Sequence, residues 1–151
     1  MFKRILVPLD GSETAEIVLP FVITEARLHN ATVLVLRVVA PLRQSLMASP
    51  GAVENAYRGI EKLAEDYLET ISAKTMAEGL EIETIVKMGK PAVQIIEVAR
   101  KHECDLIAVS THGETGGSQW RFGSVANKVV KAKISIPVIV IPTLIEINQV
   151  I

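Results

Sequence analysis

Residues 105–126 read DLIAVSTHGETGGSQWRFGSVA. An apolar run of strand length ends in Ser-Thr-His-Gly at 110–113, a loop with two further glycines follows, and a helical pattern begins at Gly123-Ser124. A buried strand that leads through such a loop into a helix is one βα unit of an α/β protein. The loop either holds a phosphate at the start of the helix or simply connects two elements.

The same strand-then-helix order repeats along the rest of the chain. Apolar runs predict strands at 4–9, 31–40, 81–88, 104–110 and 136–142. Helical periodicity predicts helices after Ser12 and at 53–77, 91–102 and 124–133, with 41–52 as a connecting loop. Pro20 lies inside the first helical pattern, so it should kink that helix or delay its regular part.

This order predicts an α/β fold with a doubly wound parallel sheet, because such crossovers are right-handed and place helices on both faces. The apolar residues are mainly Val, Ile, Leu and Ala, and aromatic residues make up only 4%. That composition is typical of parallel strands buried on both faces. Ligands of these sheets bind beyond the carboxyl ends of the strands where the strand order reverses, which here means the first and fourth strands.

Length and charge limit the classes of function. The chain has 151 residues and a net charge of −1, which indicates a single domain (1–151) and no nucleic-acid partner. The opening MFKRILVPLDG is unlike a secretory signal. No apolar run approaches the length of about 20 residues that is needed to span a membrane. With one cysteine, Cys104, we expect a cytoplasmic protein without membrane contact.

Two helix starts are predicted near the reversal of strand order, and they differ in charge. The first carries Glu13 and Glu16 in its opening turn, which would repel a phosphate. The helix that opens at Gly123-Ser124 has no acid in its first two turns, so if an anion binds, we expect it there; the alternative is an ordinary surface loop. Gly113 and Gly123 would let backbone N–H groups approach the anion, and the Ser124 hydroxyl could donate a hydrogen bond. The chain contains neither a P-loop motif nor the dinucleotide fingerprint.

Five segments together resemble the universal stress protein family across nearly the whole chain. They are ILVPLDGSETA (5–15), GKPAVQIIEVA (89–99), DLIAVSTHG (105–113), GSVANKVV (123–130) and IPVIVI (136–141). The resemblance implies a five-stranded parallel sheet in the order 3-2-1-4-5 and a dimeric assembly. In one branch of the family ATP binds through Gly-x-x-Gly, nine residues and Gly-[Ser/Thr], and another branch lacks this motif and binds no nucleotide.

The motif of the ATP-binding branch maps onto this chain with one departure. Gly113, Gly123 and Ser124 occupy its last three positions, and Ser110 replaces its first glycine. Because the downstream spacing is intact, we expect ATP binding. The resemblance also places Val38 against the adenine through its backbone. The other pocket positions that it implies are Pro8, Leu9, Asp10, Thr111, His112, Val125 and Ala126.

The resemblance therefore implies a stress-response regulatory protein that binds ATP with Mg²⁺ as a ligand or conformational switch. Hydrolysis would be slow or incidental, since no catalytic residue is evident. One alternative is a dimeric interaction module of the same family that binds no nucleotide. Another is an ATP-pyrophosphatase-type transferase, although the first turn lacks the phosphate loop of that class. We expect no zinc or iron site.

Three further expectations concern single positions and the assembly. Asp10 is either a turn residue before glycine or an acceptor for a base, a ribose or a metal. Trp120 and Phe122 should pack the loop down rather than stack on a base. The apolar fifth strand and the tail 143–151 should form a homodimer interface, because a bare strand edge favours pairing with another chain.

Overall fold

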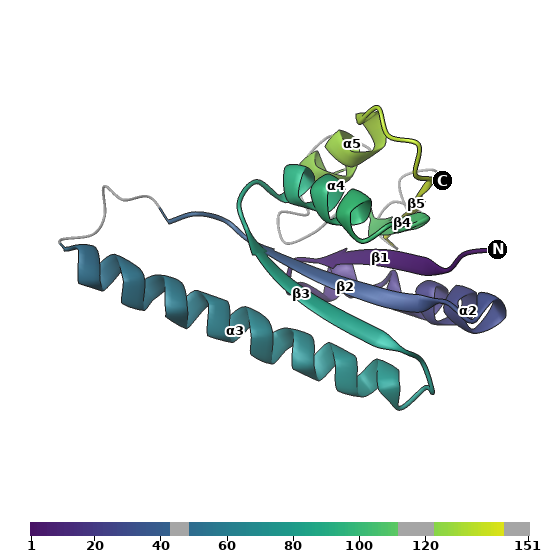
Figure 1. The fold of residues 1–151 in the computed structure, drawn as a ribbon, viewed down its shortest axis with the longest axis horizontal. Helices are drawn as coiled ribbons and strands as arrows, with labels where there is room; N and C mark the ends of the chain where they lie inside the picture. Colours follow the sequence, from purple (N-terminus) through teal and green to yellow (C-terminus); the bar gives the residue numbers. More distant parts are fainter. Residues whose placement is uncertain (43–48, 112–122, 144–151) are drawn as a thin grey trace.

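The computed structural model describes residues 1–42, 49–111 and 123–143, and it contains one five-stranded parallel sheet in the order β3-β2-β1-β4-β5 (Figure 1). Its strands are β1 (Arg4–Leu9), β2 (Thr32–Val39), β3 (Ile82–Met88), β4 (Leu106–Ser110) and β5 (Val138–Ile141). Its helices are α1 (Glu13–Glu16), α2 (Leu19–His29), α3 (Pro50–Met76), α4 (Pro91–Lys101) and α5 (Ser124–Lys131). The expected fold class and strand order are confirmed.

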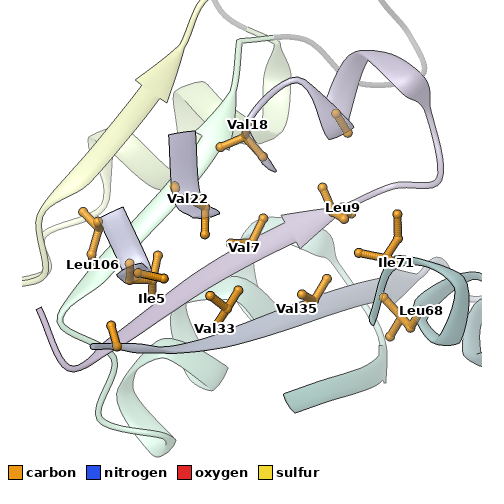
Figure 2. Close-up of a cluster of buried hydrophobic side chains, with 14 residues drawn as sticks. Ile5, Val7, Leu9, Val18, Val22, Val33, Val35, Leu68, Ile71 and Leu106 are labelled. Atoms are coloured by element: carbon orange, nitrogen blue, oxygen red, sulfur yellow. The ribbon is translucent and has the colours of Figure 1, made fainter. Parts of the chain in front are cut away.

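Each face of the sheet has its own apolar core, because side chains along a strand alternate between the two faces. On the first face, Val33 and Val35 of β2 pack with Leu68 and Ile71 of α3 and with α2 (Figure 2). We call this the α2/α3 face. On the second, the α4/α5 face, the strand residues Leu6, Leu34, Leu36 and Ile107 pack with Ile95, Val98, Ala126 and Val129. Helices therefore cover both faces, as Figure 1 shows for α3 on one side and α4 and α5 on the other.

Pro20 divides the first helical segment as expected. α1 ends at Glu16, and α2 begins at Leu19 with Pro20 in its first turn. A proline is tolerated there because the first N–H groups of a helix have no intrahelical acceptor.

The start of α3 differs from the sequence prediction. The helix begins at Pro50 rather than at residue 53, because the side chain of Ser49 caps it by accepting a hydrogen bond from the N–H of Ala52 (3.3 Å). Pro50 then occupies the first helical position, where its fixed φ is favourable. Within the described part of the chain, no helix combines the length and apolar character needed to cross a membrane.

α3 offers a matched test of the core. Leu68 is 2% exposed and packs in the α2/α3 core, whereas Leu63 on the same helix is 71% exposed. We expect Leu68→Ala to lower the free energy of unfolding by about 2–5 kcal/mol, because it leaves a cavity. Leu63→Ala should change it by no more than about 0.5 kcal/mol. Urea unfolding measures both, and equal losses would contradict this description of the core.

Candidate functional site

The carboxyl ends of β1, β2 and β4 open into a cleft of about 750 Å³. This volume is within the range of small-molecule sites. The cleft lies where the strand order reverses between β1 and β4, as predicted for this class of sheet. The described residues that line it are Pro8, Leu9, Asp10, Gly11, Ala15, Arg37, Val38, Val39, Ala40, Ile60, Leu63, Ala64, Tyr67, Pro91, Ile95, Val109, Ser110, Thr111, Gly123, Ser124, Val125 and Ala126.

The expected pocket positions that the structure describes all line this cleft. They are Pro8, Leu9, Asp10, Val38, Ser110, Thr111, Gly123, Ser124, Val125 and Ala126. The expected positions His112 and Gly113 lie outside the described residues, as do Trp120 and Phe122. That any of these residues contacts a nucleotide stays a prediction.

The end of β2 explains how Val38 comes to line the cleft. Pairing between β1 and β2 stops at Leu9 and Arg37, whereas pairing between β2 and β3 continues to Val39 and Met88. The last two residues of β2 therefore extend beyond β1. This leaves the backbone of β2 next to the cleft, on the side where β1 no longer covers it.

The two helix starts beside the cleft differ in their capping. At α1, the Ser12 hydroxyl accepts from the N–H of Ala15 (3.1 Å) and donates to Oδ1 of Asp10 (2.6 Å). Oδ1 also accepts from the N–H of Ser12 (3.0 Å), so the turn function expected of Asp10 is present. Side chains of the protein thus accept from the N–H groups of Ser12 and Ala15 at this helix start.

At α5 the cap residue is Gly123, and no side chain caps the helix. The N–H groups of Ser124, Val125 and Ala126 have no intrahelical acceptor. There is no acid in the first turn, so the positive end of the helix dipole is not neutralised by its own residues. An anion in the cleft would meet these groups directly.

Gly123 contributes differently from the sequence expectation. Its own N–H donates to the carbonyl of Thr111, so this group is not available to a ligand. The φ of Gly123 is −56°, which any residue can adopt. Thr111 in turn binds the segment that follows β5, since its N–H donates to Ile141 O (2.9 Å) and its Oγ1 accepts from the N–H of Thr143 (3.1 Å). Buried Thr111 therefore fixes the start of α5 relative to β4 and β5.

Ser110 is compatible with the backbone at the position where the family motif has glycine. It is the last residue of β4, pairs with Ile141 and is half-buried. The described non-glycine residues with positive φ are Asn30 and Glu103, so Ser110 does not require the freedom of glycine. What serine adds is a side chain at the wall of the cleft.

Sequence reasoning missed Arg37 and Tyr67, which line the cleft on the α2/α3 face. The Tyr67 hydroxyl on α3 donates to Oε1 of Glu16 on α1 (2.9 Å). Burial, followed by this bond to Glu16, raises the pKa of Tyr67. The signal for Arg37 was present, because it is a charged residue inside the apolar run 31–40.

Comparison with known proteins agrees with this geometry. The sequence profile of the Universal stress protein family matches residues 1–142. The chain belongs to the universal stress protein family. Universal stress protein MJ0531 of Methanocaldococcus jannaschii is 32% identical over 133 residues, which cover 87% of this chain and 77% of that protein.

Two solved structures of similar proteins extend the comparison. MJ0577 of the same organism has a TM-score of 0.84 at 29% identity, and the match covers 95% of this chain and 97% of that one. The universal stress protein from Archaeoglobus fulgidus, solved in complex with dAMP, has a TM-score of 0.64 at 26% identity, with 92% and 97% covered.

The bond between Tyr67 and Glu16 gives a pH-dependent prediction. A raised pKa in the folded state means that the stabilisation is complete below the unfolded pKa of tyrosine, about 10, and is lost as the pH rises above it. We expect Tyr67→Phe to be less stable than the unsubstituted protein at pH 8 and to lose less stability between pH 9.5 and 11. Urea unfolding across this range measures the difference.

Cys104 provides an internal reference for that measurement. Burial raises the pKa of its thiol to about 11, and this contributes the same alkaline loss to both proteins. The comparison therefore isolates Tyr67. Parallel stability profiles for the two proteins would contradict the assignment.

Proposed function

We propose that this universal stress protein binds an adenine nucleotide, ATP with Mg²⁺, in the cleft and that the nucleotide acts as a regulatory ligand in a stress response. The strongest support is the uncapped, acid-free start of α5, which presents three N–H groups and the Ser124 hydroxyl to the cleft. The dAMP complex of the Archaeoglobus fulgidus relative adds support from a similar protein.

The potential metal ligands in the cleft are compatible with Mg²⁺ that enters together with the phosphates of the nucleotide. Mg²⁺ in such sites is held by one or two carboxylates, phosphate oxygens and water. Among the described lining residues Asp10 is the single carboxylate, and its Oδ1 already accepts two hydrogen bonds from Ser12. Mg²⁺ would thus be held mainly by the nucleotide and water. Asp10 is the described lining residue whose side chain is of the type that binds Mg²⁺.

A regulatory role suits these residues better than rapid catalysis. The described lining includes neither a lysine nor a histidine, and its one carboxylate belongs to a turn. Fast phosphoryl transfer uses several positioned charged groups around the reacting phosphate. Hydrolysis in this cleft would therefore be slow, and binding would act by favouring one conformation or assembly.

Ser110 supports one alternative, an interaction module of the same family that binds no nucleotide. In this case the serine side chain would narrow the cleft where the ATP-binding branch has glycine. Calorimetry decides between the two. We expect one site per chain for ATP with Mg²⁺, and the absence of heat and of a thermal shift at millimolar ATP would favour the interaction module.

Substitutions at the start of α5 test the phosphate position. Asp is a preferred cap residue, so Gly123→Asp should leave the fold intact or slightly more stable while its carboxylate repels the phosphates and weakens binding strongly. Gly123→Asn is the matched control, because it caps the same N–H groups without charge and should weaken binding less. Ser124→Ala should lose a hydrogen bond to a charged group, about 1.5–3 kcal/mol.

Calorimetry on these variants, with thermal unfolding as the check on the fold, gives the result. Ser110→Gly belongs in the same series and should tighten binding if the serine only crowds the cleft. If the protein binds ATP and neither Gly123→Asp nor Ser124→Ala changes the affinity, the phosphates bind elsewhere.

We also propose a homodimer formed through the exposed edge of β5. This strand is at the edge of the sheet, as expected, and its residues are only half-buried. Pro137 O accepts from Ile107 in β4, and Ile141 O accepts from Thr111, the residue after β4. The alternate residues Val138 and Val140 therefore direct their backbone groups away from β4. The tail at 144–151, expected to join this interface, lies outside the described residues.

The edge can be blocked without removing a bond to β4. Val140→Pro removes an N–H that points away from the sheet, so it should shift the protein from dimer toward monomer. Sedimentation velocity at tens of micromolar measures the assembly, and thermal unfolding checks the fold. A monomeric unsubstituted protein at that concentration would refute the proposal.

A further inference from the structure

The cleft extends onto both faces of the sheet, and Arg37 lines its α2/α3 side. Val38 packs with the α4/α5 core, where α5 begins, whereas Arg37 follows the alternation of Val33 and Val35. A second, independent contact agrees with this placement. A Cβ built on Gly11, in the turn between β1 and α1, would lie 3.5 Å from Nη2 of Arg37.

Gly11 gives the guanidinium room beside the end of β1. The φ of Gly11 is +90°, a conformation that residues with a side chain rarely adopt. Because Gly11 has no side chain, the guanidinium of Arg37 lies against the backbone of this residue and lines the cleft. The cation is thereby held next to the position where β1 ends.

Arg37 lacks the ionic partner that most described arginines have. Arg4, Arg27 and Arg58 form salt bridges with carboxylates, and Arg100 is exposed to water. Arg37 is half-buried and forms no salt bridge with any residue that the structure describes. A permanently charged group in such a place is stabilised when an anion joins it.

Two acids beside the end of β1 and in α1 accept hydrogen bonds from donors other than Arg37. Oε1 of Glu16 accepts from Tyr67, and Oδ1 of Asp10 accepts from Ser12. The rest of this side of the cleft is contributed mainly by apolar residues of α3, Ile60, Leu63 and Ala64. Among the described residues that line this side, the guanidinium of Arg37 is therefore the cationic hydrogen-bond donor offered to a ligand.

The position of Arg37 relative to α5 indicates which part of a nucleotide reaches it. Arg37 on β2 pairs with Leu9 on β1, and β1 lies next to β4, which leads to the start of α5. Neighbouring strands are about 4.8 Å apart, so Arg37 and the end of β4 are about 10 Å apart. A nucleotide whose 5′-phosphate lies at α5 would cross the end of β1 and bring its ribose toward Arg37.

We propose that Arg37 forms a second anion subsite of the cleft, which favours a nucleotide that carries a phosphate on its ribose in addition to the 5′-phosphate. This inference rests on the proposed nucleotide function. Arginine binds phosphate through two parallel hydrogen bonds, and an arginine near the ribose is a known way to accommodate a 2′-phosphate. The 2′- and 3′-hydroxyls are both candidates for the phosphorylated position.

Calorimetry with four ligands tests the proposal: AMP, adenosine 2′,5′-bisphosphate, adenosine 3′,5′-bisphosphate and, as a test of base recognition, GMP. We expect one of the bisphosphates to bind at least about tenfold more tightly than AMP, because a hydrogen-bonded charge pair should contribute an affinity gain of this size. The preference should decrease as the salt concentration rises. The bisphosphate that binds more tightly identifies the ribose position.

Two variants assign the preference to Arg37. Arg37→Gln should bind AMP and both bisphosphates with similar affinity, whereas Arg37→Lys, which keeps the charge, should retain part of the preference. Lys87→Gln is the matched control, because it removes the same charge from the next strand at a position outside the described lining of the cleft. It should keep the full preference, and thermal unfolding checks that each variant is folded.

The outcomes separate this inference from the proposed function. If AMP binds and the bisphosphates bind no more tightly, the anion subsite is refuted while nucleotide binding stands. If Arg37→Gln keeps the preference, another residue provides it and the assignment is wrong. If the unsubstituted protein prefers GMP to AMP and Arg37→Gln removes that preference, Arg37 reads guanine O6 and N7 instead, which also overturns the proposal. Absence of binding by all these ligands overturns the anion subsite, and calorimetry with ATP and Mg²⁺ then decides whether the proposed function stands.

Discussion

The burial of β1 between β2 and β4 is the constraint on which the rest of the structure depends. Ile5, Leu6 and Val7 are fully buried, and they contribute to the cores of both faces of the sheet. Because β1 is central and parallel to its neighbours, the carboxyl ends of β1, β2 and β4 must meet at one edge. The cleft follows from that arrangement, since the chain leaves β1 and β4 on opposite faces and the helices after them diverge.

The two helix starts beside the cleft differ in capping and in charge, so the two sides of the cleft differ in how they would receive an anion. The start of α1 binds the Ser12 side chain and carries two acids, so its field is largely satisfied within the protein. The start of α5 has neither feature. With Arg37 on the opposite face, the cleft presents a guanidinium and an uncapped helix start at two separated points, with Asp10 at the end of β1 between them.

The fold could be predicted from the sequence because local signals and tertiary structure agree. The apolar runs of strand length form strands in the structure. Ser12 caps α1, and Pro20 lies in the first turn of α2, as their local preferences predict. The sequence pattern predicts the start of α3 three residues late, because Ser49-Pro50 fits loop composition as well as a cap followed by a first helical residue. The same two residue types serve both purposes, and only the hydrogen bond to Ala52 distinguishes them.

The residues that line the cleft could be predicted where they follow a motif along the chain, and less so where they depend on distant elements. Asp10 and Ser124 follow strand ends and helix starts, which sequence patterns locate. Tyr67 reaches the cleft only because α3 packs across the sheet, a contact that no local pattern reveals. The bond from the N–H of Gly123 to the carbonyl of Thr111 likewise joins two residues that the motif alone does not place together.

The length of α3 has a consequence for how the cleft responds to what enters it. The helix has 27 residues and is about 40 Å long, but its buried residues begin only at Ala64. Its first half extends beyond the sheet (Figure 1), supported by the exposed pairs Arg58–Glu54 and Lys62–Asp66. Local opening is least costly where little apolar surface is buried. The wall at Ile60 and Leu63 therefore belongs to the most easily rearranged part of α3, and the cleft combines a rigid floor at the strand ends with one adjustable side.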